Sequence, residues 1–284
     1  MKVLVAIDKS PESQIALRYV CHLVEHFDAT VDALHVKQDV TQLVLEDFDV
    51  PFLKKEDIAE KVEKETKEVE ENIIESCQVC LAGKVPCEPK IVVGEPAEEI
   101  LRVAREGNYD LIVLGSHGHS ALAGFLLGTI HTKILHYARR PILIARSYRT
   151  IQKVLVAYRG TKCDQAALHF IAPLLARKKP QITVLHVQET ELGESKEFAE
   201  ACLLYSDNVL KSFDHAPIMK HAEGDFVRET LNEILANDYD LLVLGAYGHQ
   251  RSKIFKVISD EALTLVSRTT TPVLVYRNKD EKTE

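Results

Sequence analysis

Cysteine, methionine and tryptophan are scarce in this chain. Its 284 residues include six cysteines, two methionines and no tryptophan. Six cysteines are too few for a disulfide scaffold of this length and suit a reducing compartment, in which thiols stay free or bind metal. Apolar runs are short, and none reaches the roughly 18 residues that a membrane-spanning helix needs. Because residues 1–8 (MKVLVAID) already include an acidic side chain, we expect no signal peptide and a cytoplasmic protein.

An excess of basic charge is missing as well. The chain has 43 acidic and 35 basic residues, which gives a formal net charge of −8. This balance disfavours a broad electrostatic contact with nucleic acid or an anionic membrane surface, although it leaves room for a local basic pocket. Apolar residues make up 46% of the chain and charged residues 27%, as is typical of a globular protein. At roughly 100–200 residues per domain, the length predicts two domains.

An internal repeat accounts for this length. Four segments of the first half recur in the same order in the second. The pairs are Lys2–Ala6 with Lys153–Ala157, Leu34–Val36 with Leu185–Val187, Tyr109–Gly115 with Tyr239–Gly245, and Arg140–Ile144 with Thr271–Val275. The offset between later pairs is shorter because the first copy carries extra residues. Two copies of one domain, 1–148 and 152–278, explain the length.

Each copy alternates short apolar, β-branched runs with longer stretches of helical period. This alternation is typical of βαβ units around a buried parallel sheet. Ser10 before Pro11 predicts the start of one helix, and Glu95 before Pro96 predicts another. We predict an α/β fold with two tandem five-stranded, mainly parallel sheets and helices on both faces. In the first copy the strands are expected at 2–7, 31–36, 90–93, 110–114 and 141–145.

The first copy contains an insertion of mixed charge from Lys54 to Glu71. Glu60 and Lys64, and likewise Glu63 and Lys67, have the i,i+4 spacing of helical ion pairs. We interpret the insertion as a solvated helix at the edge of the domain. A helix that binds a partner is the alternative, but no feature of the sequence identifies a partner.

The segment that carries chemistry follows the predicted strand 110–114. It has the pattern Gly115-x2-Gly118-x9-Gly128-Thr129. Ligands of open α/β sheets bind outside the carboxyl ends of the strands, and glycine permits positive φ and close approach of a ligand. Gly128-Thr129 precedes an apolar-periodic run, so a phosphate fits the expected helix N-terminus. Glycines that only make tight turns are the alternative interpretation.

Two well-known phosphate loops are excluded. The chain has no G-x-x-x-x-G-K-[ST] segment, and no G-x-G-x-x-G follows the first strand. Neither a P-loop NTPase nor a dinucleotide-binding Rossmann unit is therefore indicated. The spaced glycines, together with Val5–Asp8 and Leu34–Val36, instead resemble the ATP-binding class of universal stress proteins, in the tandem form with two fused domains.

The resemblance implies a position for the base and ribose of ATP. Asp8 would lie beside the ribose and adenine, and Val36 would give main-chain contacts to the base. Gly115 and Gly118 would flank the ribose and the α-phosphate. The same resemblance implies that the final strands, 141–145 and 273–276, pair antiparallel within one chain. It leaves open whether two chains form a homodimer.

The resemblance also implies a cradle for the outer phosphates. Gly128, Thr129 and the N–H of Ile130 would hold the β- and γ-phosphates, with Mg²⁺ shared among phosphate oxygens. His117 and His119 lie in the same loop and are candidates for phosphate contact, although loop histidines are more often only solvated. No residue has an evident role as a catalytic base, which disfavours fast turnover.

The second copy departs from the motif at two positions. Arg159 stands where the first copy has Asp8, and Ile258 stands where it has Gly128. A β-branched residue adopts positive φ only at a cost, and its side chain would occupy space that a phosphate needs. We expect an impaired second site. Arg159, Arg251 and Lys253 could hold another anion, but scattered basic residues are more often ordinary surface residues.

Three of the cysteines form the pattern Cys77-x2-Cys80-x6-Cys87. Paired thiols at this spacing are a common half of a zinc site, and neighbouring thiols also serve in redox sensing. No second C-x-x-C follows, so structural cysteines are the favoured interpretation and we expect no bound metal.

The leading functional hypothesis is a universal stress protein that binds ATP in its first domain and acts as a nucleotide-dependent regulator or binding module in the stress response. A slow ATPase or autophosphorylating enzyme is one alternative. A scaffold that binds another small molecule or protein through the second domain is the other.

Overall fold

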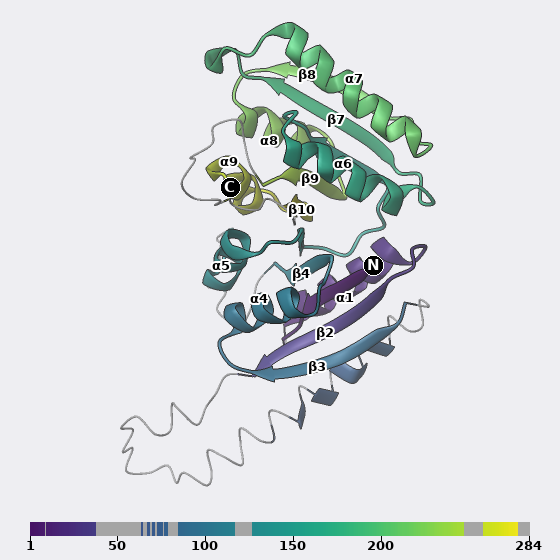
Figure 1. Cartoon of the computed structure of the whole chain (residues 1–284), viewed down its shortest axis with the longest axis vertical. Helices are drawn as coiled ribbons and strands as arrows, with labels where there is room; N and C mark the ends of the chain where they lie inside the picture. The colour runs from purple at the N-terminus through teal and green to yellow at the C-terminus, as the bar shows by residue number, and fades with distance from the viewer. Residues whose placement is uncertain are drawn as a thin grey trace, which may run out of the picture.

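The computed structural model consists of two halves of similar architecture (Figure 1). Both halves alternate β-strands with α-helices along the chain. The structure describes residues 1–8, 10–37, 64, 67–68, 70–71, 73–75, 77–78, 85–116, 127–246 and 258–277.

The first half contains β1 to β5. Its elements are β1 (Lys2–Ala6), α1 (Pro11–Val24), β2 (Thr30–Lys37), β3 (Cys87–Val93), α4 (Pro96–Glu106), β4 (Leu111–Gly115), α5 (Thr129–Tyr137) and β5 (Ile142–Ala145). The five predicted strands are all present, but β3 begins three residues earlier than expected. Pro89 is tolerated in β3 because this strand pairs only with β2, at the edge of the sheet.

The second half repeats this order. Its elements are β6 (Lys153–Ala157), α6 (Lys162–Leu175), β7 (Gln181–Gln188), the 3₁₀ turn η1 (Thr190–Leu192), α7 (Lys196–Ser212), β8 (Ile218–Glu223), α8 (Phe226–Ala236), β9 (Leu241–Gly245), α9 (Asp260–Arg268) and β10 (Val273–Tyr276). The described residues of the predicted insertion helix, from Lys64 to Glu71, are helical and exposed or half-buried. One of them, Glu70, forms an ion pair with Lys37 at 2.5 Å.

All ten strands belong to one sheet in the order β3-β2-β1-β4-β5-β10-β9-β6-β7-β8. Pairing is parallel within each half, and the two halves join through β5 and β10, which are antiparallel with Leu143 opposite Leu274. The predicted antiparallel pairing of the final strands is therefore confirmed. These strands lie in the centre of the sheet, and its edges are β3 and β8 at the far ends of Figure 1.

Apolar side chains are buried on both faces of the sheet. One face packs against α1, α6 and α7, through residues such as Leu17, Leu168 and Leu210. The other face packs against α4, α5, α8 and α9, through residues such as Ile134 and Leu265. The predicted arrangement of helices on both faces is confirmed. Burial on two faces also explains why the central strands are apolar throughout instead of alternating.

The predicted helix starts are observed where the sequence places them. Ser10 is the N-cap of α1, and its hydroxyl accepts a hydrogen bond from the Ser13 N–H at 3.3 Å. Pro11 follows as the first helical residue. Glu95 caps α4 in the same way, with Pro96 at the first helical position. An N-cap acceptor satisfies one N–H of the first turn, and proline supplies the helical φ without needing a donor.

Two arginines, one from each half, donate hydrogen bonds to backbone carbonyls of the other half. Arg277, just after β10, donates to the carbonyls of Leu135 at 2.5 Å and His136 at 2.9 Å in the last turn of α5. Arg146, just after β5, donates to the carbonyl of Val266 at 2.5 Å in the last turn of α9. Burial lowers the pKa of the Arg146 guanidinium. Each half thus supplies a cation to the carboxyl end of a helix in the other half, where the helix dipole favours positive charge.

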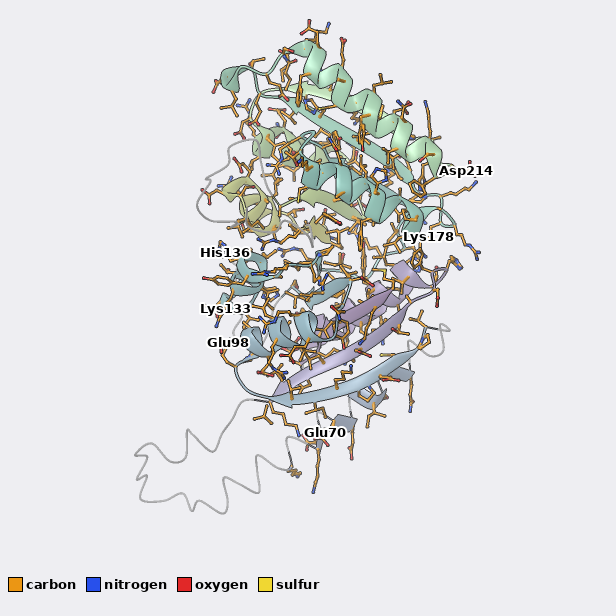
Figure 2. All side chains as sticks on the ribbon, in the orientation of Figure 1. Glu70, Glu98, Lys133, His136, Lys178 and Asp214 are labelled. Carbon is orange, nitrogen blue, oxygen red and sulfur yellow. The ribbon has the colours of Figure 1, made fainter. Side chains whose placement is uncertain are left out.

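Further contacts between the halves lie along α1. The Tyr19 hydroxyl donates to the carbonyl of Asp240 at 2.9 Å. Lys178, labelled in Figure 2 where the two halves meet, forms an ion pair with Glu25. The two halves are therefore joined by side chains as well as by the sheet.

Candidate functional site

The strand order of the first half changes direction at β1. β1 lies between β2 and β4, so the chain winds in one direction from β1 to β2 and in the other from β1 to β4. In open α/β sheets the crevice at such a reversal, outside the carboxyl ends of the strands, is the usual ligand site. Asp8 follows β1, Val36 lies near the end of β2, and Gly115 ends β4. The structure therefore brings these three predicted residues together at the carboxyl ends of neighbouring strands.

The Asp8 side chain is held by the start of α1. Its carboxylate accepts hydrogen bonds from the Ser10 N–H at 2.9 Å and from the Ser10 hydroxyl. The Ser13 hydroxyl donates to the Asp8 carbonyl at 2.8 Å. These bonds hold Asp8 against the start of α1, so that its half-buried carboxylate has a defined position just after the carboxyl end of β1.

Gly115 is required by packing instead of by its dihedral angles. It is not among the glycines with positive φ, and a Cβ atom on it would lie 2.8 Å from the backbone carbonyl of Glu12. Gly128 has an ordinary φ of −64°. The expectation of positive φ is therefore wrong for Gly115, whose missing side chain lets the first turn of α1 approach the end of β4.

The N-terminus of α5 is open. Gly128 is its N-cap, and within the described residues no side chain caps the first-turn N–H groups. The first turn contains no acidic residue, Thr129 is exposed, and Ile130 is half-buried. Among the residues that the structure describes, a Cβ on Gly128 would meet the His131 ring alone, at 3.6 Å. Uncapped N–H groups and the positive end of the helix dipole make this helix start a suitable position for an anion.

His131 connects α5 to the carboxyl end of β4. Its ring is buried, and Nε2 lies 2.5 Å from the carbonyl oxygen of Gly115. This contact fixes the helix start beside the end of β4. His131 was not predicted from the sequence, although its position three residues after Gly128 places it one helical turn into α5.

Half-buried apolar side chains also lie at the carboxyl ends of the strands and at the start of α5. Val36 and Val92 are cross-strand neighbours near the ends of β2 and β3, and both pack against the core on the face of α5. Leu127 and Ile130 pack against the same core from the start of α5. Such partly exposed apolar side chains could contact the flat face of a ligand. Val92 and Leu127 were not predicted, because strand neighbours and loop ends are not visible in local patterns.

Three predicted site residues, His117, Gly118 and His119, lie outside the described residues. Cys80 does as well. In the described part of the chain, no three or more His, Cys, Asp or Glu side chains are grouped to hold a metal ion. Within the same residues, none of the helices has the length and apolar character needed to span a membrane.

The cysteines differ from the expectation at one position. Cys77, Cys87, Cys163 and Cys202 are thiols, as expected in a reducing compartment. Cys21, buried in α1, is disulfide-bonded, so the expectation of thiols throughout is wrong there.

The corresponding place in the second half is filled by its own side chains. Arg159 is only 2% exposed, and its Nη2 donates to the carbonyl of Gly245 at 2.9 Å. Its guanidinium lies 4.5 Å from the ring centroid of Phe226, and its Nη1 lies 3.9 Å from a carboxylate oxygen of Glu261. Arg159 therefore occupies the space between the end of β9 and the start of α9.

The start of α9 is also closed. Ser259 is its N-cap, so the prediction that Ile258 matches Gly128 is wrong, because the N-cap position that Gly128 holds in α5 belongs to Ser259 in α9. The Ser259 hydroxyl accepts a hydrogen bond from the Ala262 N–H at 3.3 Å. Asp260 and Glu261 place two carboxylates in the first turn, and Ile258 is buried. Nearby, burial raises the pKa of Glu189, although the charge of Arg159 acts in the opposite direction. An incoming phosphate would meet a satisfied N–H and like charge at this helix.

Comparisons with known proteins agree with this architecture. The sequence model of the universal stress protein family matches residues 1–146 and again residues 150–277. The chain belongs to the universal stress protein family. Each half of it corresponds to one copy of the family's fold.

Individual family members match different shares of the chain. The universal stress protein YxiE of Bacillus subtilis is 34% identical over 146 residues, which cover 51% of this chain and 98% of that protein. The universal stress protein Slr1230 of Synechocystis is 31% identical over 61% of this chain and 59% of its own length. The crystal structure of a universal stress protein from Archaeoglobus fulgidus covers 98% of both chains with a TM-score of 0.74 and 20% identity. At that identity the structural match shows the fold alone.

Proposed function

We propose that this universal stress protein binds ATP in its first half and acts as a nucleotide-dependent regulator or binding module in the stress response. The observation that carries the proposal is the open N-terminus of α5, which His131 fixes beside the carboxyl end of β4. Helix starts of this kind bind phosphate groups through backbone N–H donors.

In this proposal the N–H groups of Thr129 and Ile130 hold the outer phosphates. The missing side chain of Gly128 leaves the space through which those phosphates approach the helix. Mg²⁺ is held through the phosphate oxygens, consistent with its preference for phosphate and water ligands. In the same proposal Gly118 flanks the ribose and the α-phosphate, and His117 and His119 contact phosphate.

The adenine base and the ribose lie at the carboxyl ends of the strands. Val36 and Val92 supply half-buried apolar contacts to the adenine ring. The carboxylate of Asp8 accepts a hydrogen bond from a ribose hydroxyl. Because Ser10 already holds this carboxylate, Asp8 positions the ligand, and among the described residues of the site no group has an evident role as a catalytic base. Binding, rather than rapid hydrolysis, is therefore the proposed activity.

Calorimetric titration of the full chain with Mg-ATP tests the proposal. We expect a stoichiometry near one per chain, because Arg159 and the capped start of α9 fill the second site. Gly128→Ile, which puts a branched side chain at the N-cap of α5, should weaken binding by at least about 100-fold, or roughly 2.7 kcal/mol. Gly128→Ala is the matched control, since among the described residues its Cβ meets the His131 ring alone, and it should leave the affinity within a few-fold.

Circular dichroism and thermal unfolding establish that the variants are folded. An unchanged affinity in folded Gly128→Ile would show that phosphate does not bind at α5. Two equal sites per chain would show that the second half is not blocked. Nucleotide that co-purifies with the wild-type chain but not with Gly128→Ile would support the proposal without assuming a reaction.

A further inference from the structure

Two thiols meet beneath the surface at the edge of the first half. Cys77 belongs to the helical residues before β3, and Cys87 is the first residue of β3. Their Sγ atoms lie 2.9 Å apart, and the residues are only 3% and 7% exposed. A disulfide has an S–S distance of about 2.05 Å, so the two sulfur atoms need to approach by less than about 1 Å to form one.

The two thiols have different proton affinities. The Cys87 thiol donates a hydrogen bond to the sulfur of Cys77, and this bond lowers the pKa of Cys77. The same bond, followed by burial, raises the pKa of Cys87. Of the two thiols, Cys77 therefore loses its proton more readily than Cys87. A nucleophilic thiolate beside a resolving thiol is the arrangement of redox-active cysteine pairs.

The other thiols have different surroundings. Cys163 donates to the carbonyl of Tyr276 at 3.2 Å. Burial raises the pKa of Cys202 to about 12. A raised pKa reduces the thiolate fraction and hence reactivity. These two cysteines thus serve as internal controls for the pair.

The fold does not require the pair. Glu88 pairs with Asp32 on the neighbouring strand, and in the same register of the second half Ile218 pairs with Thr183. Pro217 therefore stands where the first half has Cys87. The second half forms the same sheet edge without a thiol at this position, so packing of the edge strand does not explain Cys87.

Cys87 lies close to the protein surface. Pro86 and Glu88, on either side of it, are exposed, and β3 is an edge strand. We propose that Cys77 and Cys87 form a reversible disulfide when the protein is oxidised by a hydroperoxide. The bond would link the helical segment that contains Cys77 to β3.

The reaction balances in two steps. The Cys77 thiolate attacks the O–O bond of hydrogen peroxide, an S–O bond forms, and hydroxide leaves and takes up a proton to become water. Cys87, after losing its proton, then attacks the sulfenic sulfur. The S–S bond forms, the S–O bond breaks, and a second water leaves. Two thiols are oxidised by two electrons, and the peroxide is reduced.

This site is separate from the proposed nucleotide site. Cys87 begins β3, whereas the proposed nucleotide site lies at the other end of this strand, near Val93. At about 3.3 Å per residue, the two ends of this strand are roughly 20 Å apart. Formation of the disulfide and binding of ATP can therefore succeed or fail independently.

The experiment uses the full chain, reduced with dithiothreitol, freed of reductant and exposed to hydrogen peroxide. We expect non-reducing peptide mapping by mass spectrometry to detect a Cys77–Cys87 linked peptide, with loss of alkylation at both residues and full recovery of alkylation after reduction. In Cys87→Ser, Cys77 should stop at the sulfenic acid, which dimedone labels. A variant with Cys163→Ser and Cys202→Ser should form the linked peptide as the wild type does.

Two results would overturn the proposal. One is the absence of the linked peptide in wild-type protein after peroxide treatment while Cys77 remains open to alkylation. The other is one zinc ion per wild-type chain, found by elemental analysis and released when the thiols are alkylated, because such an ion would hold the thiols as ligands. Both results are obtained on wild-type protein, so they stand even where a cysteine variant fails to fold.

Discussion

The two halves of this universal stress protein share a fold but differ at the start of one helix. α5 begins with Gly128, an uncapped turn and no acidic residue, whereas α9 begins with a Ser259 cap followed by two carboxylates. In the second half, Arg159 lies against this turn. The second half thus provides from its own side chains the negative and positive charges that a phosphate and its counterion would bring to the first. A ligand site can be closed by internal charges while the surrounding sheet stays the same.

At the junction, by contrast, the halves are nearly equivalent. β5 and β10 occupy matching positions, and each is followed by an arginine that contacts the last turn of a helix in the other half. The residues at the starts of α5 and α9 differ between the halves, whereas the junction residues correspond. Each junction surface must fit the other, as in an isologous dimer.

The largest expected effect tests the equivalence of the two junction strands. Leu143→Pro should reduce the free energy of unfolding by at least about 3 kcal/mol, because proline removes a ladder donor and a buried side chain from a central strand. Leu274→Pro, at the opposed position, should cause a similar loss. Urea unfolding measures both, with Leu143→Met as a control that keeps the volume. A mild effect of one proline and a severe effect of the other would show that the junction is asymmetric.

The second prediction removes one half altogether. An isolated fragment of residues 1–148 would expose the edge of β5, with the apolar side chains of Ile142, Leu143 and Ile144. Unpaired strand edges promote association, so we expect the fragment to self-associate through β5. Sedimentation velocity over a range of concentrations measures this, and Leu143→Pro in the fragment should weaken it. A stable, strictly monomeric fragment at high concentration would contradict this account of the junction.

The third prediction compares the two arginines. Arg277→Gln should lower the free energy of unfolding by roughly 1.5–3 kcal/mol, because hydrogen bonds to a charged group are lost and buried carbonyls are left unsatisfied. Arg146→Gln should have a smaller effect, since Arg146 contacts one carbonyl in the last turn of α9 whereas Arg277 contacts two in the last turn of α5. Urea unfolding of both variants, beside Arg277→Lys, provides the ranking. The reverse ranking would show that bond number does not determine the stabilisation.

The smallest expected effect copies one charge from the second half into the first. Ile130→Asp, which puts a carboxylate into the first turn of α5 as Asp260 and Glu261 do in α9, should stabilise α5 by about 0.3–1 kcal/mol relative to Ile130→Asn through the helix dipole. It should also weaken the proposed ATP binding by at least about tenfold, or 1.4 kcal/mol, because the new carboxylate repels phosphate. Ile130→Asn, which loses the same apolar side chain without adding charge, is the matched control. Equal ATP affinity in the Asp and Asn variants would show that the added charge does not cause the weaker binding.

Much of the fold could be predicted from the sequence because its signals are local or repeated. The repeated KVLVA segment indicates β1 and β6, and the Ser10–Pro11 pair indicates the start of α1. The early start of β3 at Cys87 was not predicted, because proline within the segment disfavours a strand and only the edge position makes it acceptable.

The candidate site was less accessible to sequence reasoning. Gly115 is constrained by the backbone of Glu12, and His131 contacts the carbonyl of Gly115. Arg159 fills its own half by reaching Gly245, more than eighty residues away along the chain. These contacts join segments that are distant in the sequence. No local pattern of residue types encodes them.

The covalent link between the two halves changes the thermodynamics of their junction. Residues 146–152, between β5 and β6, hold the two matching surfaces on one chain. For a short linker of this kind the effective concentration of one surface around the other is on the order of millimolar. Two separate copies would dissociate on dilution, with an equilibrium that follows the amount of protein in the cell. In the fused chain the pairing of β5 with β10 is a first-order event, so the junction persists at any expression level.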